Sequence, residues 1–304
     1  MTKKFEGIIA YPVTPFKADG SVDVDMLKEL IDRLIDSGVH AIAPLGSTGE
    51  SAYLSDEEWE TAARSSLAAV AGRVPTVVGI SELTTVGAIK RARFAERAGA
   101  DAVMVLPVSY WKLTEAEIIA HYAAIGEAVS VPIMLYNNPA TSGIDMQPEL
   151  IARICQGVPS VTMVKESTGD LQRMHRLKQL TDGTIPFYNG SNPLALAALN
   201  AGAAGWCTAA PNLNAELPLA LYDAVKRNDV VNARLTFERL LPLLQFIVRI
   251  GLPTSVKAGL ALQGIDAGEP RLPLRPLPSA AVGQLSDILA TLKGTTSPGV
   301  SIAA

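Results

Sequence analysis

Eight short apolar runs alternate with longer amphipathic segments over the first 210 residues, and this alternation constrains the fold more than any other feature. Stretches between the runs, such as 23–38, place apolar residues at helical spacing. Strands that are apolar on both faces and separated by helices indicate a parallel sheet covered by helices. A count of eight predicts an α/β fold of the closed (β/α)8 TIM-barrel type. The runs are 7–13, 40–46, 75–80, 101–107, 131–137, 161–166, 185–190 and 204–210.

An open dinucleotide-binding sheet is the main alternative fold. That fold carries a GxGxxG motif after its first strand, whereas this chain has "AYPVTPF" at 10–16. The starts of two expected helices also fit the alternation, because Ser55 with Glu58 and Thr114 with Glu117 have capping-box spacing. We therefore expect the barrel.

The alternation stops after the eighth run, and only helical patterns follow. A proline-rich stretch at 268–278, "GEPRLPLRPLP", separates the last two of them. We expect residues 1–230 to form a TIM-barrel catalytic domain. Residues 231–304 are expected to form a C-terminal helical extension, packed on the barrel or on a neighbouring subunit, with a loose tail at 294–304. The helical patterns cover 215–227, 231–250, 254–263 and 279–293.

The composition excludes several classes of protein. The chain has 304 residues, 48% of them hydrophobic, and a formal net charge of −4, so nucleic-acid binding is not expected. It contains no apolar run long enough for a membrane span and no apolar signal-peptide core at the N-terminus. Cys155 and Cys207 form no CxxC pair, which favours a reduced, cytoplasmic compartment. The three histidines lack metal-ligand spacing, so we expect neither a metal nor another cofactor.

The sixth apolar run ends in a lysine, within "VTMVKESTGD" at 161–170. In a TIM barrel, chemistry takes place at the C-terminal ends of the strands. A structural interpretation of Lys165 is an ion pair with Glu166 or Asp170. The catalytic interpretation is that a partly desolvated amine loses its proton and attacks a carbonyl carbon, forming a Schiff base without any metal. We favour the catalytic interpretation because no obvious acid lies at the neighbouring strand ends.

Two further strand ends carry groups suited to this chemistry. Tyr136 either fills space as a buried ring or carries protons beside a lysine imine. The motif "GSTGE" at 46–50 is either a plain turn or a carboxylate site made of backbone N–H groups and hydroxyls. It is too short for a nucleotide-binding Walker loop.

Taken together, GSTGE, the "YNNPATSG" motif at 136–143 and VKES at 164–167 resemble the dihydrodipicolinate synthase / N-acetylneuraminate lyase family of pyruvate-dependent Schiff-base enzymes. The opening "GIIAYPVTPF" and the stretch at 268–277 extend the resemblance over nearly the whole chain. The resemblance implies a class I aldolase mechanism, a small 2-oxo acid as substrate and a homotetramer built as a dimer of dimers.

The resemblance also implies a role for individual residues. Lys165 matches the Schiff-base lysine, Tyr136 the tyrosine that relays protons, and Ser47 the hydroxyl of the same relay. The substrate-binding positions are Thr48 and Gly46 of the GSTGE motif, which face the carboxylate, and Gly190 with the backbone of Cys207, which line the pyruvate pocket.

Two departures from the family pattern concern the substrate. Synthases of the family carry an arginine that grips the carboxylate of the second substrate, and here that position is Thr141. Losing such a clamp costs about 2–5 kcal/mol at a desolvated ion pair. In "LPVSYWKL" at 106–113, Ser109 aligns with a tyrosine that reaches the neighbouring subunit's site. Tyr110, one position later, and Trp111 are the candidates for that role, and Tyr110 is the one we include among the substrate-binding residues.

Three functional hypotheses follow. The first is a pyruvate-dependent lyase, an aldolase or dehydratase, acting on a sugar-acid-derived or hydroxy-oxo-acid substrate. The alternative is 4-hydroxy-tetrahydrodipicolinate synthase, which joins pyruvate to aspartate semialdehyde in lysine biosynthesis, and the neutral Thr141 ranks it second. A non-catalytic keto-acid-binding protein ranks last, because lysine, tyrosine and serine are all present.

Overall fold

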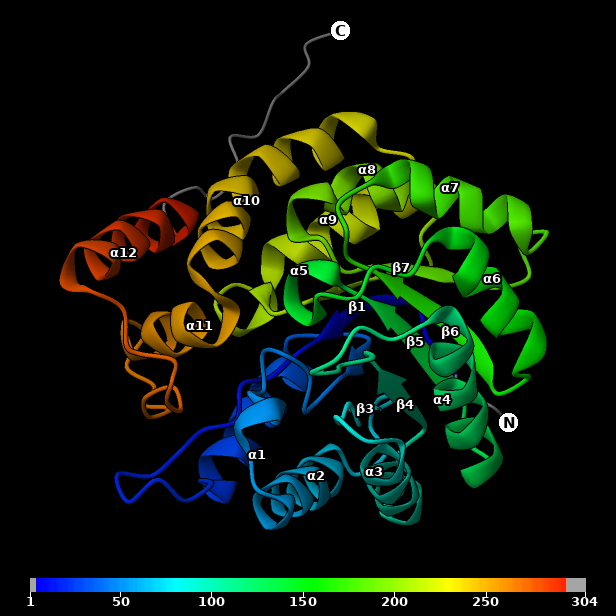
Figure 1. The fold of residues 1–304 in the computed structure, drawn as a ribbon. Coiled ribbons are helices and arrows are strands. Elements are labelled where there is room, and N and C mark those ends of the chain that lie inside the picture. The colour runs from blue at the N-terminus through cyan, green and yellow to red at the C-terminus, as the bar shows by residue number, and fades with distance from the viewer. Residues whose placement is uncertain (1–3, 294–304) are drawn as a thin grey trace, which may run out of the picture.

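The structure is a computed structural model that describes residues 4–293, with a sheet of eight parallel strands at its centre (Figure 1). The strand order is β2–β1–β8–β7–β6–β5–β4–β3. A parallel bridge between Ile42 and Thr76 joins the two edges, so the barrel is nearly closed and the predicted (β/α)8 fold is confirmed. Every strand lies inside the apolar run that predicted it. The strands are β1 Gly7–Ala10, β2 Ala41–Ile42, β3 Val77–Gly79, β4 Ala102–Val105, β5 Ile133–Asn137, β6 Val161–Glu166, β7 Phe187–Asn189 and β8 Gly205–Thr208.

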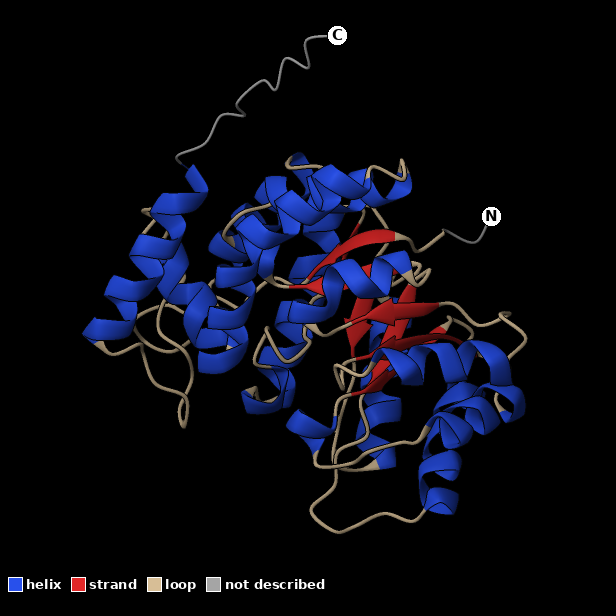
Figure 2. Cartoon of the chain, turned by 90° about the horizontal axis from the view of Figure 1, so that it is seen from above, coloured by secondary structure: helices blue, strands red, loops and turns tan. Residues whose placement is uncertain are grey.

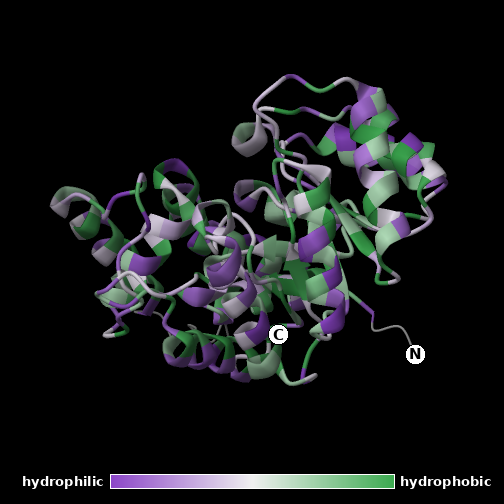
Figure 3. Cartoon of the chain, turned by 60° about the horizontal axis from the view of Figure 1, so that its bottom comes forward, coloured by the Kyte–Doolittle hydropathy of each residue, from purple (hydrophilic) through white to green (hydrophobic). Residues whose placement is uncertain are grey.

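Alternate residues of the strands supply two apolar layers. Ile9 and Met104 belong to a cluster inside the barrel, whereas Ile8 and Val103 belong to a larger cluster between strands and helices. Figure 3 shows the strands in hydrophobic colours and the helices with mixed ones. Because strand residues alternate in direction, every second side chain at a strand end points into the barrel.

Helices surround the strands, as Figure 2 shows. Both predicted capping boxes are present: Glu58 N donates to Ser55 Oγ at 3.3 Å and Ser55 N to Glu58 Oε2 at 2.8 Å, and Thr114 with Glu117 repeats the pattern. The barrel helices are α1 Val24–Asp36, α2 Asp56–Val70, α3 Thr85–Arg97, α4 Glu115–Ala128, α5 Pro139–Ser142, α6 Pro148–Gly157, α7 Leu171–Leu180, α8 Ala195–Asn200 and α9 Glu216–Lys226, with short 3₁₀ helices η1 Ser51–Tyr53, η2 Asn192–Leu194 and η3 Ala210–Asn212.

The predicted C-terminal helices are also present, each close to its expected ends. They are α10 Val230–Ile250, α11 Leu252–Ala261 and α12 Ser279–Lys293. Leu240, Val256 and Leu285 join the apolar cluster that covers the strands, so the barrel and the extension share one core. The domain division at residue 230 remains a prediction, and the tail at 294–304 lies outside the described residues.

Within residues 4–293, no helix combines the length and the apolar composition that a membrane span requires.

Candidate active site

A cavity of about 360 Å³ lies at the C-terminal ends of the barrel strands. Its walls come from the ends of β1, β5, β6 and β8, from the loops after β2 and β7, and from the junction of α10 with α11. The structure therefore gathers groups that are far apart in the sequence. The predicted site residues that line the cavity are Ser47, Thr48, Tyr136, Thr141, Lys165, Gly190 and Cys207.

Lys165 is buried, with only 5% of its surface exposed. Its Nζ atom lies 3.8 Å from the ring centroid of Tyr136 and 4.0 Å from that of Tyr11. Among residues 4–293, no carboxylate forms an ion pair with this amine. An unpaired buried amine is costly for folding, which makes it a candidate for function.

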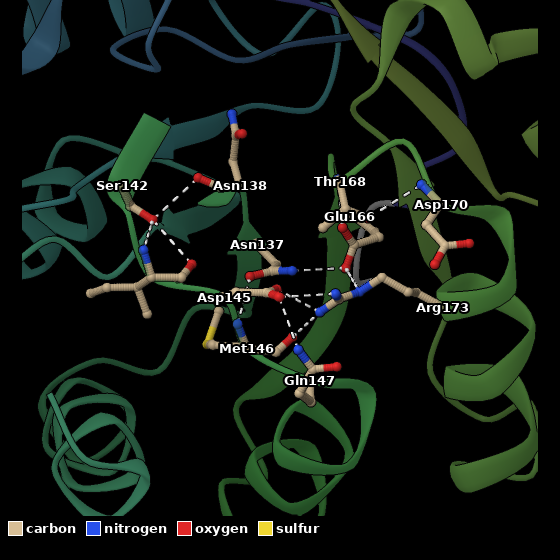
Figure 4. Close-up of polar contacts among 11 residues, drawn as sticks. Asn137, Asn138, Ser142, Asp145, Met146, Gln147, Glu166, Thr168, Asp170 and Arg173 are labelled. Carbon is tan, nitrogen blue, oxygen red and sulfur yellow. Dashed lines mark hydrogen bonds and ion pairs between the residues drawn. The ribbon is translucent and has the colours of Figure 1, made fainter. Parts of the chain in front are cut away.

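The acids that the structural interpretation of Lys165 required are engaged elsewhere (Figure 4). Glu166 accepts hydrogen bonds from Asn137 Nδ2 at 3.0 Å and from Thr168 N at 2.7 Å, and its Oε2 lies 3.8 Å from Arg173 Nε. Asp170 is exposed and forms the N-cap of α7. The carboxylate next to Lys165 in sequence thus belongs to a polar network on the outer side of the strand, because consecutive strand residues point in opposite directions.

Tyr136 is held by a short hydrogen-bond chain. Asn138 Nδ2 donates to the Tyr136 hydroxyl at 2.8 Å and also lies 2.9 Å from Thr141 Oγ1. Thr141 therefore orients Asn138, which in turn orients the phenol. No hydrogen bond joins the Ser47 and Tyr136 side chains within residues 4–293, and the proton relay through them stays a prediction.

The GSTGE loop offers unpaired backbone donors to the cavity. Gly49 N donates to Gly46 O at 3.0 Å and Glu50 N to Ser47 O at 3.2 Å, which closes the turn. Within the described part of the chain, the N–H groups of Ser47 and Thr48 donate to no other group. Two such donors at a cavity wall suit a small carboxylate.

Two glycines are required by close packing around the amine. A Cβ on Gly190 would lie 1.9 Å from Ser167 Oγ and 2.8 Å from Lys165 Cε. A Cβ on Gly46 would lie 2.8 Å from the Tyr11 ring. Gly46 is not among the residues that line the cavity, and its predicted contact with substrate stays a prediction.

Cys207 is buried at the end of β8. Burial raises the pKa of its thiol, although the positive charge of Lys165 and a hydrogen bond with Tyr11 oppose this effect. The thiol is therefore a neutral wall of the cavity at neutral pH.

Tyr110 is not part of this cavity. Its side chain is 97% exposed and that of Trp111 is 79% exposed, on the loop after β4. A single chain does not bring either ring to Lys165, so their predicted role across a subunit boundary stays a prediction.

Several cavity residues were missed by the sequence analysis. Tyr11 follows β1 directly, so the rule that strand ends carry the chemistry was a sufficient signal for it. Ser167 lies two residues after Lys165, and its buried Oγ has no hydrogen-bond partner within residues 4–293. Val248 and residues 251–253 come from the extension, and no sequence pattern places them at the barrel mouth.

Lys165 is the only charged residue among those that line the cavity, all of which lie within the described residues. The remaining polar groups are hydroxyls and amides, among them Asn138, Thr141, Ser191, Asn192 and Thr208. No guanidinium stands at the wall, in agreement with the neutral residue at position 141.

Comparisons with known proteins agree on one group of relatives. The model of the dihydrodipicolinate synthetase family matches residues 4–292. Proteins named 4-hydroxy-tetrahydrodipicolinate synthase are similar to this chain: that of Methanoculleus marisnigri is 34% identical over 288 residues, covering 94% of this chain and 98% of the relative. That of Bacillus subtilis is 33% identical over 273 residues, covering 90% and 94%. A crystal structure from Pseudomonas aeruginosa, assigned provisionally as a dihydrodipicolinate synthetase, has a TM-score of 0.94 at 59% identity and covers 95% of this chain and 100% of its own.

Proposed function

Because the chain belongs to the dihydrodipicolinate synthetase family, as its sequence predicted, we propose that Lys165 binds pyruvate or another small 2-oxo acid as a Schiff base. Enzymes of this family are lyases, and this chain is an enzyme of that class. The observation that carries the proposal is a buried lysine without a carboxylate partner, beside two free N–H donors in one cavity.

The proposed reaction begins when the neutral amine of Lys165 attacks the keto carbon. The resulting carbinolamine loses its hydroxyl group as water and becomes a protonated imine. Loss of a proton from the adjacent carbon gives an enamine, which attacks the carbonyl carbon of a second substrate; the reverse sequence cleaves a carbon–carbon bond. Tyr136 and Ser47 carry the protons, and the N–H groups of Ser47 and Thr48 bind the carboxylate. Gly190 and the backbone of Cys207 leave room for the small acid.

The relatives favour one second substrate. They carry the name 4-hydroxy-tetrahydrodipicolinate synthase, which supports condensation of pyruvate with aspartate semialdehyde as the first candidate reaction. This order reverses the preference that Thr141 suggested in the sequence.

A second candidate is cleavage of a sugar-acid-derived or hydroxy-oxo acid, a reaction in which aspartate semialdehyde is not a substrate. The cavity wall supports it, because hydroxyls and amides surround Lys165 and no second cation is present to bind another carboxylate.

The Schiff base is tested by adding pyruvate and borohydride and locating the reduced adduct by mass spectrometry. We expect one three-carbon adduct on Lys165 in the wild type and none in Lys165→Arg, which keeps a positive charge but is a poor nucleophile. An unmodified wild type at saturating pyruvate would rule the proposal out. Thermal stabilisation by pyruvate without any adduct would instead favour a non-catalytic binding protein.

The second substrate is tested with the same protein in two assays. One measures consumption of pyruvate with aspartate semialdehyde, and the other measures pyruvate release from a panel of hydroxy-oxo acids. Turnover in only one assay identifies the reaction.

For the assembly we propose a cytoplasmic homotetramer, a dimer of dimers. The exposed rings of Tyr110 and Trp111 support a subunit contact on the loop after β4. Sedimentation equilibrium gives the molecular mass in solution of the wild type and of the double variant Tyr110→Ala with Trp111→Ala. A wild type that is as monomeric as the double variant would contradict the proposed contact.

A further inference from the structure

The nitrogen of Lys165 has two cationic forms, the ammonium group and the protonated imine of the proposed Schiff base. In most proteins a carboxylate compensates such a buried cation. Here the nearest carboxylate in sequence, Glu166, is bound to Asn137 and Thr168. The groups that touch Nζ are the rings of Tyr11 and Tyr136, at 4.0 and 3.8 Å from their centroids.

Tyr11 is fixed independently of any substrate. Its N–H donates to Thr208 O at 3.1 Å, and its carbonyl accepts a hydrogen bond from Asn212 Nδ2 at 2.9 Å. The hydroxyl donates to Met104 Sδ at 3.2 Å, and the ring packs against Gly46. The side chain is only 3% exposed, so the ring face beside Nζ has little freedom to move.

The hydroxyl of Tyr11 is poorly placed for proton transfer. It donates to the thioether of Met104, which cannot pass a proton on, and the neighbouring Cys207 thiol is buried with a raised pKa. Burial also raises the pKa of Tyr11 well above its ordinary value, so the phenol stays neutral. Tyr136 differs, because its hydroxyl lies at the cavity wall and accepts a hydrogen bond from Asn138. Any effect of Tyr11 on Lys165 therefore comes from its ring face.

We infer that Tyr11 is a positioning residue, whose ring face takes the place of a carboxylate and stabilises the cationic forms of the Lys165 nitrogen. This inference rests on the proposed Schiff base. The negative face of an aromatic ring attracts a cation most strongly where water is excluded. Unlike a carboxylate, a ring does not form a salt bridge with the amine, and the nitrogen remains able to form a covalent bond.

Two substitutions separate the ring face from the volume of the side chain. Tyr11→Phe keeps the ring and loses only the hydroxyl, whereas Tyr11→Leu keeps an apolar side chain without a ring. Tyr11→Met, which retains more volume, replaces Tyr11→Leu if that variant does not fold. Tyr188→Leu is the matched control, because Tyr188 is also buried inside the barrel, next to Lys165 in the register of β6 and β7, but within residues 4–293 its ring forms no cation–π contact with Nζ.

Two measurements report the two cationic forms. The first is the pyruvate concentration that gives half-maximal borohydride trapping, which follows the stability of the protonated imine. The second is the rate at which cyanate carbamylates Lys165, followed by peptide mass spectrometry. In that reaction the neutral amine adds to isocyanic acid, a nitrogen–carbon bond forms, and a proton moves from the amine to the new amide nitrogen.

For Tyr11→Leu we expect weaker trapping of the imine but faster carbamylation of the amine. Half-maximal trapping needs about ten-fold more pyruvate, a change of about 1.4 kcal/mol. Carbamylation becomes about ten-fold faster, because the ammonium form has lost its stabilising ring. Tyr11→Phe recovers most of both effects, and Tyr188→Leu changes neither by more than about three-fold.

A purely structural role predicts a different result. If Tyr11→Leu displaces the lysine, trapping and carbamylation both fall, and the inference is wrong. It is equally wrong if Tyr11→Phe and Tyr11→Leu behave alike. A wild type that gives no pyruvate adduct refutes the proposed function alone, because the carbamylation rates still decide what the ring does to the nitrogen.

Discussion

Two lysines are buried within residues 4–293, and they differ in what compensates their charge. Lys165 is 5% exposed and Lys257 is 3% exposed, and each places Nζ 4.0 Å from the centroid of a ring, Tyr11 or Phe16. Lys257 Nζ also lies 2.7 Å from Glu50 Oε1, whereas no carboxylate pairs with Lys165 within residues 4–293. Burial and an aromatic neighbour are therefore shared by both lysines, and the absence of an acid distinguishes the one that we propose as the nucleophile.

The size of the neighbouring cavity would select Lys257 instead of Lys165 as the candidate nucleophile. Lys257 lines a cavity of about 760 Å³, larger than the one of about 360 Å³ at Lys165. Yet its amine already has two polar partners, because besides the ion pair with Glu50 it donates to Glu269 O at 3.0 Å. Burial lowers the pKa of Lys257, and the ion pair with Glu50 opposes this shift.

Both lysines have neighbours in the GSTGE loop, Lys165 in the cavity lined by Ser47 and Thr48 and Lys257 in its pair with Glu50. Glu50 is the last residue of the GSTGE motif and adopts a left-handed conformation, with φ of 56°. Its Oε1 pairs with Lys257 of α11, and its Oε2 accepts a hydrogen bond from Arg271 N at 2.6 Å. Residues of the extension thus contact the loop whose Ser47 and Thr48 line the cavity at Lys165.

The largest effect is expected from Lys165→Met. Removing the nucleophile should lower kcat by roughly 10⁴-fold or more. The melting temperature should stay the same or rise, because a buried unpaired amine has been replaced by an apolar side chain. Activity assays and calorimetry measure both. A clear fall in melting temperature would show that Lys165 is a structural residue like Lys257.

The next effect is expected from Lys257→Met. This substitution leaves the carboxylate of Glu50 buried and unpaired, so the free energy of unfolding should fall by about 3–5 kcal/mol in urea titrations. The KM for pyruvate should rise as the loop loses its support, while the borohydride adduct still forms on Lys165.

A double variant provides the control for that result. Glu50→Gln combined with Lys257→Met removes both charges and should recover much of the lost stability. If the double variant is less stable than Lys257→Met alone, the ion pair does not act as described.

Gly190→Ala tests how accurately Lys165 must be placed. The added Cβ would lie 2.8 Å from Lys165 Cε, so the side chain must shift. A displacement near 1 Å should lower kcat/KM by about 100-fold. Gly157→Ala is the matched control, since a Cβ there meets nothing within 4 Å. Equal activity of the two variants would mean that the nitrogen tolerates displacement.

The sequence predicted those features of the site that depend on local patterns of apolar residues. Alternating apolar runs placed Lys165 and Tyr136 at strand ends, where a barrel carries its chemistry, and the structure confirms both positions. The pairing of Glu50 with Lys257 was not predictable, because it depends on how α11 packs against a distant loop. The contact of Tyr11 with Lys165 across the barrel was missed for the same reason. Periodicity encodes which face of an element is buried, but not which residue of another element meets it.

The smallest effect is expected at Glu58, which is linked to Glu50 and Lys257 through Arg271. Arg271, whose N–H binds Glu50, also pairs with Glu58. Burial alone raises the pKa of Glu58, but bonds from Arg271 and Ser55 outweigh it and hold the pKa below the ordinary 4.5. The folded carboxylate then binds fewer protons than the unfolded one. Its contribution to stability is complete above pH 4.5 and is lost as the pH falls through the folded value.

Glu58→Gln should therefore lower the free energy of unfolding at pH 7 by about 0.5–1 kcal/mol, as for a partly exposed pair. The difference from wild type should shrink as the pH falls from 5 toward 3, because the wild-type carboxylate becomes protonated. Glu149→Gln is a suitable comparison, since its pair with Arg176 is half exposed and lies away from the loop. Urea titrations at several pH values measure both variants. A loss of unfolding free energy for Glu58→Gln near that of Lys257→Met would mean that the support of the GSTGE loop extends through Arg271 as far as α2. Lys257 would then be one member of a wider cooperative network.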